Sequence, residues 1–362
     1  MIKIKKISLV LVIISLFSLP VSAKAADSGD YVTDFENILP ENSNFESDEI
    51  LSSVGPDKLL SEILSSVSES GGELVSFFLL LLGIGLLTSF VDVSSGLLGT
   101  RLFSAVRAGV SGICALLIFS RLEGLVLSVG ENLDLISGFF SSLIPIITGI
   151  LLSSGAVSSA GIQAVNMNLT LGVIGKLSSE LLMPLVFMIF ALALTSSLGN
   201  GGSARLGKGV KSIFLWILGI ATTVLVASMS LQSFLATSRD NAALRAAKYA
   251  LSSSIPIVGS TVSAALSTLT GALSEAGAVV GVGSVAVIFT MAASPIVIML
   301  LYRISLSVSI WLFEFVGSTV AERSFSAFRS ALDTLISVYA VSAVVYILEI
   351  VVFIRGGVNI FV

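Results

Sequence analysis

Two groups of hydroxyl side chains, each following a proline in an apolar segment, are the residues of this sequence best placed to handle a polar solute. They are Ser153, Ser154, Ser158 and Ser159 behind Pro145, and Ser260, Ser263 and Ser267 behind Pro256. A proline removes a backbone donor and frees a carbonyl. Unpaired backbone at membrane depth is tolerated only inside protein or beside a watery cavity, where hydroxyls can satisfy it. We predict that these residues line or gate a path through a membrane.

Ionisable side chains in apolar segments are costly to bury and are therefore candidates for function. Glu314 lies within Trp311-Leu312-Phe313-Glu314-Phe315. If residues 304–320 cross a bilayer, Glu314 sits near its middle and could serve an ion or polar path; if that segment is interfacial, Glu314 faces water. Glu349 lies close to Arg355, and we expect it to be solvated. We expect Asn166 and Asn168 to bond to nearby backbone or to line a cavity.

Several classes of chemistry are excluded by what the sequence lacks. It has no histidine and a single cysteine, Cys114, so a zinc site, a histidine base and an intrachain disulfide are not expected. Gly281-x-Gly283-x-x-Ala286 imitates a dinucleotide fingerprint, but no strand precedes it. The four-residue spacing of Gly277 and Gly281 is instead typical of a close contact between two helices. We expect no catalytic residue, metal or cofactor, no enzyme activity and no nucleic-acid partner.

The composition places the chain in a lipid bilayer. Hydrophobic residues make up 55% and charged residues 12%, and the mean hydropathy is +1.04. We predict an all-α, polytopic membrane protein with about seven transmembrane helices and two half-membrane hairpins. The expected spans are 74–91, 104–120, 177–198, 212–237, 276–302 and 332–354, with a weaker seventh at 304–320. The hairpins are expected at 139–165 and 251–275, where a pair of ordinary short helices is the alternative.

The N-terminal region is expected to be a targeting signal followed by an acidic segment. Three lysines precede an apolar run that ends in Ala23-Lys24-Ala25, so residues 1–25 are typical of a signal peptide, although an uncleaved anchor helix is the alternative. Residues 26–73 form an acidic extracytoplasmic segment. Within it, residues 59–67 repeat apolar side chains at helical spacing, and we predict a short amphipathic helix ended by Gly71-Gly72. That helix would act as a connector or would dock a partner.

The integral membrane domain, residues 74–362, contains an internal parallel repeat. Ile144-Pro145-Ile146 recurs as Ile255-Pro256-Ile257 and Pro184 recurs as Pro295, both at an offset of 111 residues (255−144 and 295−184). The repeats would cover about 104–198 and 215–309, although a chain rich in Ile, Val, Ser and Gly can match itself by chance. Interrupted apolar segments in corresponding positions are typical of channels and transporters.

Basic residues assign the sides of the membrane. Arg101, Arg107, the run from Arg205 to Lys211, Arg303 and Arg355 are expected in the cytoplasm by the positive-inside rule, which makes the C-terminus cytoplasmic. The segment 239–248 breaks this pattern, because it is forced outside while carrying three bases.

Several short motifs resemble the stage III sporulation protein AE family. They are Leu143-Ile144-Pro145, Ser153-Ser154-Gly155-Ala156, Arg245-Ala246-Ala247-Lys248-Tyr249, Ile255-Pro256-Ile257-Val258-Gly259, Ser294-Pro295 and Tyr302-Arg303. The resemblance covers nearly the whole chain. It departs from the pattern after Pro-x-Val-Gly, where relatives tend to carry acids and this chain has Ser263, Ala264 and Ser267.

The resemblance implies a multi-pass protein of the mother-cell membrane that surrounds the forespore. It would be a subunit of a channel or secretion-like complex needed for endospore development. Implied partners are other membrane and cytoplasmic subunits, including an ATPase, and a forespore-side protein in the intermembrane space. The sequence has no phosphate-binding loop, so ATP use would come from a partner. The alternatives are a stand-alone secondary transporter (permease) for a small solute and a structural scaffold.

Overall fold

Long apolar segments form helices in this chain because a helix satisfies its own backbone hydrogen bonds where no water is available. The computed structural model describes residues 29–39, 56–94, 100–176, 183–197, 201–254 and 259–358, and these contain helices and no strand. The helices are α2 (Gly29–Asn37), α4 (Pro56–Val93), α5 (Thr100–Ser153), α6 (Val157–Lys176), α7 (Met183–Ser197), α8 (Gly201–Ser254), α9 (Gly259–Val316) and α10 (Thr319–Val358).

The predicted all-α membrane class is confirmed. Within the described ranges, five helical stretches are long and apolar enough to cross a bilayer: Ser70–Val93, Phe103–Ser153, Gly209–Ala246, Ala276–Val316 and Thr319–Ile354. The predicted number of about seven spans, the half-membrane hairpins and the internal repeat are not confirmed by this structure. Residues 1–28, which include the predicted signal peptide, lie outside the described part.

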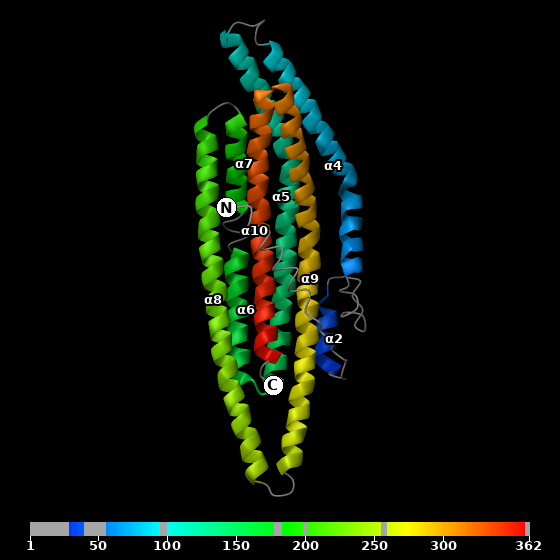
Figure 1. The fold of residues 1–362 in the computed structure, drawn as a ribbon, viewed down its shortest axis with the longest axis vertical. Helices are drawn as coiled ribbons and strands as arrows, with labels where there is room; N and C mark the ends of the chain where they lie inside the picture. Colours follow the sequence, from blue (N-terminus) through cyan, green and yellow to red (C-terminus); the bar gives the residue numbers. More distant parts are fainter. Residues whose placement is uncertain are drawn as a thin grey trace.

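The long helices lie side by side in an elongated bundle (Figure 1). Helix α10 packs against every other long helix, and α6 and α7 follow one another along the same side of the bundle. Helices α5 and α6 run in opposite directions and form one helical hairpin, α8 and α9 form another, and α6 and α7 run in the same direction (Figure 1). The predicted hairpin region 139–165 therefore contains a chain reversal, whereas the residues that join α8 to α9 within region 251–275 lie outside the described part.

One of the two landmark pairs of the predicted repeat can be compared in the structure. Pro145 lies inside α5, and its counterpart Pro256 lies outside the described residues. Pro184 is the second residue of α7, whereas Pro295 lies inside α9. The carbonyl of Met291, which Pro295 leaves without its helical donor, lies 3.5 Å from the Tyr339 hydroxyl.

Two predicted helix boundaries are wrong. Helix α4 continues through Gly71-Gly72 into the first span, because packing on α9 offsets the roughly 0.5–1 kcal/mol that each glycine costs in a helix. Helix α9 continues past Arg303 to Val316, so the predicted span 276–302 and most of the predicted span 304–320 belong to one helix. The reversal comes instead at Gly317, whose φ of 82° favours glycine. Arg303 Nε pairs with Asp333 Oδ1 of α10 at 2.5 Å and so does not mark a helix end.

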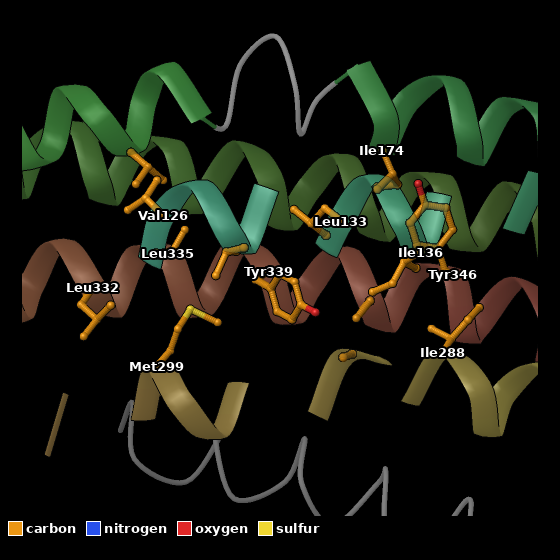
Figure 2. Packing of buried hydrophobic residues seen from close by; sticks show 14 of the residues in the cluster. Val126, Leu133, Ile136, Ile174, Ile288, Met299, Leu332, Leu335, Tyr339 and Tyr346 are labelled. Carbon is orange, nitrogen blue, oxygen red and sulfur yellow. The ribbon is translucent and has the colours of Figure 1, made fainter. Parts of the chain in front are cut away.

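The core lies along α10. Figure 2 shows Leu332, Leu335, Tyr339 and Tyr346 of α10 between side chains of α5, such as Leu133, and of α9, such as Met299. All of these side chains are buried. The outer surface is also apolar, with Trp216 and Phe234 of α8 each 68% exposed. A surface of this kind needs lipid or another protein around it.

The acidic N-terminal segment contains a helix that the sequence did not suggest. Helix α2 packs on α5 and α9. Its Phe35 is completely buried and meets Phe139 of α5 edge to face, and the Tyr31 hydroxyl lies 2.5 Å from Ser153 Oγ. Part of this segment is thus attached to the bundle.

The two glycines expected at a helix contact are both buried on α9; Gly277 faces α5 and α10, and Gly281 faces α10. A Cβ on Gly277 would lie 3.5 Å from Ile150 Cγ2 and 3.6 Å from Phe353 Cζ, which is ordinary contact. A Cβ on Gly281 would lie 2.5 Å from Cγ1 of Ile354. Of these two glycines, Gly281 therefore has less room for a side chain against α10.

The same substitution at these two glycines should have different effects. Gly281→Ala forces the β-branched Ile354 to move, and overpacking of this kind destabilises a core by about 1–3 kcal/mol. At Gly277 there is room for the methyl group of alanine, so Gly277→Ala should leave the stability unchanged or raise it slightly. Thermal unfolding in detergent checks this, and equal melting temperatures for the two variants would contradict the close approach at Gly281.

Candidate functional site

Three polar residues of α10 bond to neighbouring helices inside the bundle. The Tyr339 hydroxyl donates to Asn132 Oδ1 of α5 at 2.5 Å, and the Tyr346 hydroxyl lies 2.8 Å from Ser137 Oγ of α5. Gln163 Nε2 of α6 donates to Glu349 Oε1 at 3.0 Å. Each of the three α10 side chains is at most 1% exposed. Buried polar groups of this kind fix the register of one helix against another.

Glu349 is the most unusual member of this set. The sequence prediction that it is solvated is wrong, since its side chain is 1% exposed. Its Oε2 atom has no hydrogen-bond partner among the described residues. Ser342, Tyr346 and Glu349 follow each other at spacings of four and three residues, which places polar groups on one face of an apolar helix. That spacing is the signal by which the sequence could have indicated burial.

A second polar stripe runs along α6 and faces the first. Gln163, Asn166 and Thr170 are spaced by three and four residues and are at most 4% exposed. Thr170 Oγ1 donates to Asn166 O at 3.0 Å and lies 3.5 Å from Met229 Sδ of α8. Asn168 is exposed and bonds to Ala164 O of its own helix at 2.8 Å. The polar face of α6 therefore lies between α10 and α8.

The turn between α5 and α6 is tied to α8 by a carboxylate. Gly155 has a φ of 81°, and Ala156 N donates to Leu151 O at 2.9 Å, which closes α5. The backbone N–H groups of Ser158 and Ser159 then donate to Asp240 Oδ1 at 3.1 Å and Oδ2 at 2.6 Å. Free N–H groups and the positive end of the helix dipole both favour a carboxylate here.

The hydroxyls predicted to line a path gather at this turn. Ser154 is buried and donates to Leu151 O at 2.7 Å, and Ser153 contacts Tyr31. Pro145 is exposed on α5. Pro256 and the side chains of Ser260, Ser263 and Ser267 lie outside the described part, so the structure brings together the first group only. Whether these residues line a path stays a prediction.

Glu314 lies in the last turn of α9 and is exposed. Its carbonyl accepts from Gly317 N at 3.1 Å in the turn that leads to α10. Its side chain therefore faces outward at a helix end. A role for Glu314 in a path stays a prediction.

A second carboxylate ties the α9–α10 turn, and the sequence analysis missed it. Asp92 Oδ2, at the end of α4, accepts from Ser318 Oγ at 3.2 Å and from Val320 N at 3.5 Å. Arg107 Nε of α5 lies 3.7 Å from Asp92 Oδ1. The two turns lie toward opposite ends of the bundle, and each is closed by an acid from a different helix (Figure 1).

The chemistry available in this region is hydrogen bonding and the exchange of a proton or small cation. Among the described residues, no three His, Cys, Asp or Glu side chains lie close enough together to hold a metal ion. The interior offers amide, hydroxyl and carboxyl groups on α6, α8 and α10, and Glu349 is the carboxyl among them that bonds to another side chain.

Comparison with known proteins identifies the family. Residues 33–357 match the family model described as Stage III sporulation protein AE (spore_III_AE). The chain belongs to this family. A curated relative, Stage III sporulation protein AE of Bacillus subtilis (strain 168), is 26% identical over 275 residues, which is 74% of this chain and 68% of the relative. No solved structure matches the chain. The resemblance inferred from the short motifs is confirmed, and the family implies a role in sporulation; it is not a known enzyme family.

Removing the carboxylate that caps α6 should loosen that helix. Asp240→Ala leaves the amides of Ser158 and Ser159 without their acceptor, and loss of such a cap costs about 0.5–2 kcal/mol. Hydrogen exchange of the first turn of α6 should become faster, whereas Glu123→Ala, which removes an exposed acid of α5, should leave it unchanged. Unaltered exchange in Asp240→Ala would show that the cap does not stabilise α6.

Proposed function

We propose that this chain is a membrane subunit of the channel or secretion-like complex that connects the mother cell with the forespore and is needed for endospore development. The observation that carries the proposal is the family match over residues 33–357, in a chain with five apolar helices long enough to span a membrane. Its place would be the mother-cell membrane around the forespore. The exposed apolar side chains of α4, α5, α8 and α9 supply surface for lipid and for neighbouring subunits.

The α5–α6 turn is the part of the chain that we propose lines or gates the path. Ser153, Ser154, Ser158 and Ser159 gather there, next to the carboxylate of Asp240. Ser260, Ser263 and Ser267 would contribute from the start of α9. The partners would be other membrane and cytoplasmic subunits, including an ATPase, and a forespore-side protein that meets the acidic segment in the intermembrane space.

The experiment replaces the chain's counterpart in a sporulating strain and compares two tryptophan variants at one turn. Ser158 is half-buried beside Asp240, whereas Leu152 is 53% exposed on the outer side of α5. Ser158→Trp should abolish the activity of a reporter gene expressed in the forespore, while the chain still co-purifies with the other subunits. Leu152→Trp should behave as the unchanged chain.

The other outcomes identify the alternatives. Loss of co-purification in Ser158→Trp, with a normal melting temperature of the purified chain, would favour a structural scaffold. Solute uptake into vesicles that contain the purified chain alone would favour a stand-alone permease. Normal reporter activity in Ser158→Trp would remove this turn from the path.

The directions of α4 and α10 predict which side of the membrane the C-terminus lies on. Helix α4 begins and α10 ends toward the same end of the bundle (Figure 1). Because α9 does not reverse at Arg303, we propose that the C-terminus lies on the extracytoplasmic side with the acidic segment, contrary to the side expected from the sequence. A cysteine added after Val362 in a Cys114→Ala chain should react with an impermeant maleimide outside intact cells. Labelling only after lysis would place the C-terminus in the cytoplasm.

A further inference from the structure

The side chain of Glu349 sits in a place where a negative charge has no compensation among the described residues. It is 1% exposed, and the side chains that hydrogen-bond to it, the Gln163 amide and the Thr170 hydroxyl of α6, are both neutral. Oε2, the second carboxylate oxygen, has no partner. Two of the described cations pair with other acids, Arg107 with Asp92 and Arg303 with Asp333. Burying an isolated carboxylate is far more costly than burying the neutral acid.

The other titratable groups around Glu349 do not supply a counter-charge. Helix α6 carries no ionisable side chain from Val157 to Gly175. The groups named here are Tyr346 on α10, bonded to Ser137; exposed Asp134 on α5; and Asp240 on α8, which caps α6. The side chains of Glu275 on α9 and Arg355 on α10 lie outside the described part. A proton can neutralise a single carboxyl group without further ligands, whereas Na⁺ or a divalent cation needs several oxygens.

Helix α6 is the element that a change of charge at Glu349 would move. It has 20 residues, shorter than its long neighbours, and besides its apolar packing on α5, α8 and α10 it makes three polar contacts along its length. These are with Asp240 at its first turn, with Glu349 through Gln163, and with Met229 beside Thr170. The middle contact depends on the Glu349 carboxyl. An ionised carboxylate there would draw water into the α6–α10 contact or push the two helices apart.

We propose that Glu349 is a proton-exchange site, and that α6 packs on α10 when the carboxyl holds its proton and separates from α10 when the proton leaves. The step is an acid–base exchange with solvent: the O–H bond of the acid breaks, the proton passes to water, and no electrons are transferred. The site would make the packing of the bundle sensitive to proton concentration. It goes beyond the proposed function and does not depend on it, since the purified chain suffices for both tests.

The first test measures the exposure of α6 at different pH values. In a Cys114→Ala chain, Met167→Cys places a thiol at a position that is completely buried, and Leu169→Cys places one at a position that is 50% exposed on the same helix. The ratio of their labelling rates with a membrane-permeant maleimide removes the pH dependence of the thiol itself. We expect this ratio to rise with pH, and to stay low at every pH when Glu349→Gln is added. A ratio that does not change with pH, or that rises equally in the Glu349→Gln chain, would overturn the proposal.

The second test observes the proton directly and does not need a substitution in the core of α6. Infrared spectra of the full chain with labelled glutamate should contain the carbonyl band of a protonated carboxylic acid, which disappears as pH rises. The band should be absent in Glu349→Gln and retained in Glu123→Gln, which changes an exposed acid. Absence of the band at all pH values would overturn the proposal. So would its removal by added Na⁺ at constant pH, because that result would identify a sodium site.

Discussion

A polar group inside an apolar bundle has to find its hydrogen-bond partner on a neighbouring helix, because neither lipid nor a hydrocarbon core can supply one. In this chain the rule acts mainly through α10, which lies against all the other long helices. Tyr339, Tyr346 and Glu349 each take their partner from α5 or α6. Apolar packing alone would allow one helix to slide along another, since Leu, Ile and Val are interchangeable at many contacts. The three polar pairs remove that freedom, because each pair is satisfied in one register only.

The two tight turns obey the same rule at the ends of helices. Each reversal leaves the first N–H groups of the next helix without acceptors. Asp240 supplies the acceptor for α6 and Asp92 supplies it for α10, and both acids come from helices that are not adjacent in sequence to the turns they close. The position of α8 is thereby coupled to the α5–α6 hairpin, and that of α4 to the α9–α10 hairpin. A helix cannot shift at one of these turns without leaving a buried amide unsatisfied.

What could be predicted from the sequence follows from this physics. Hydropathy identified the helical class and the membrane character, because burial in lipid requires long apolar runs with internally satisfied backbone. The sequence did not indicate that α4 continues through Gly71-Gly72 or that α9 continues past Arg303, because local signals for a helix end were overruled by packing and by the Arg303–Asp333 pair. The burial of Glu349, which was expected to be solvated, and the role of Asp240 were also not predicted. Their partners, Gln163 and the amides of Ser158 and Ser159, lie far away in the chain, and no local pattern reveals such a pairing.

The length of α5 bears on whether the chain can act alone. The apolar stretch Phe103–Ser153 has 51 residues, about 75 Å at 1.5 Å per residue, whereas a bilayer with its headgroups is about 40–45 Å thick. Arg121, Glu123, Glu131 and Asp134 are exposed in the middle of this stretch and cannot face acyl chains at depth. One bilayer can therefore cover only part of α5, on one side of these charges. Both sides carry exposed apolar residues, such as Ile113 and Leu116 before the charges and Leu135 and Leu152 after them. The part outside the lipid needs a protein surface to cover it, which supports a subunit of an assembly over a solitary permease.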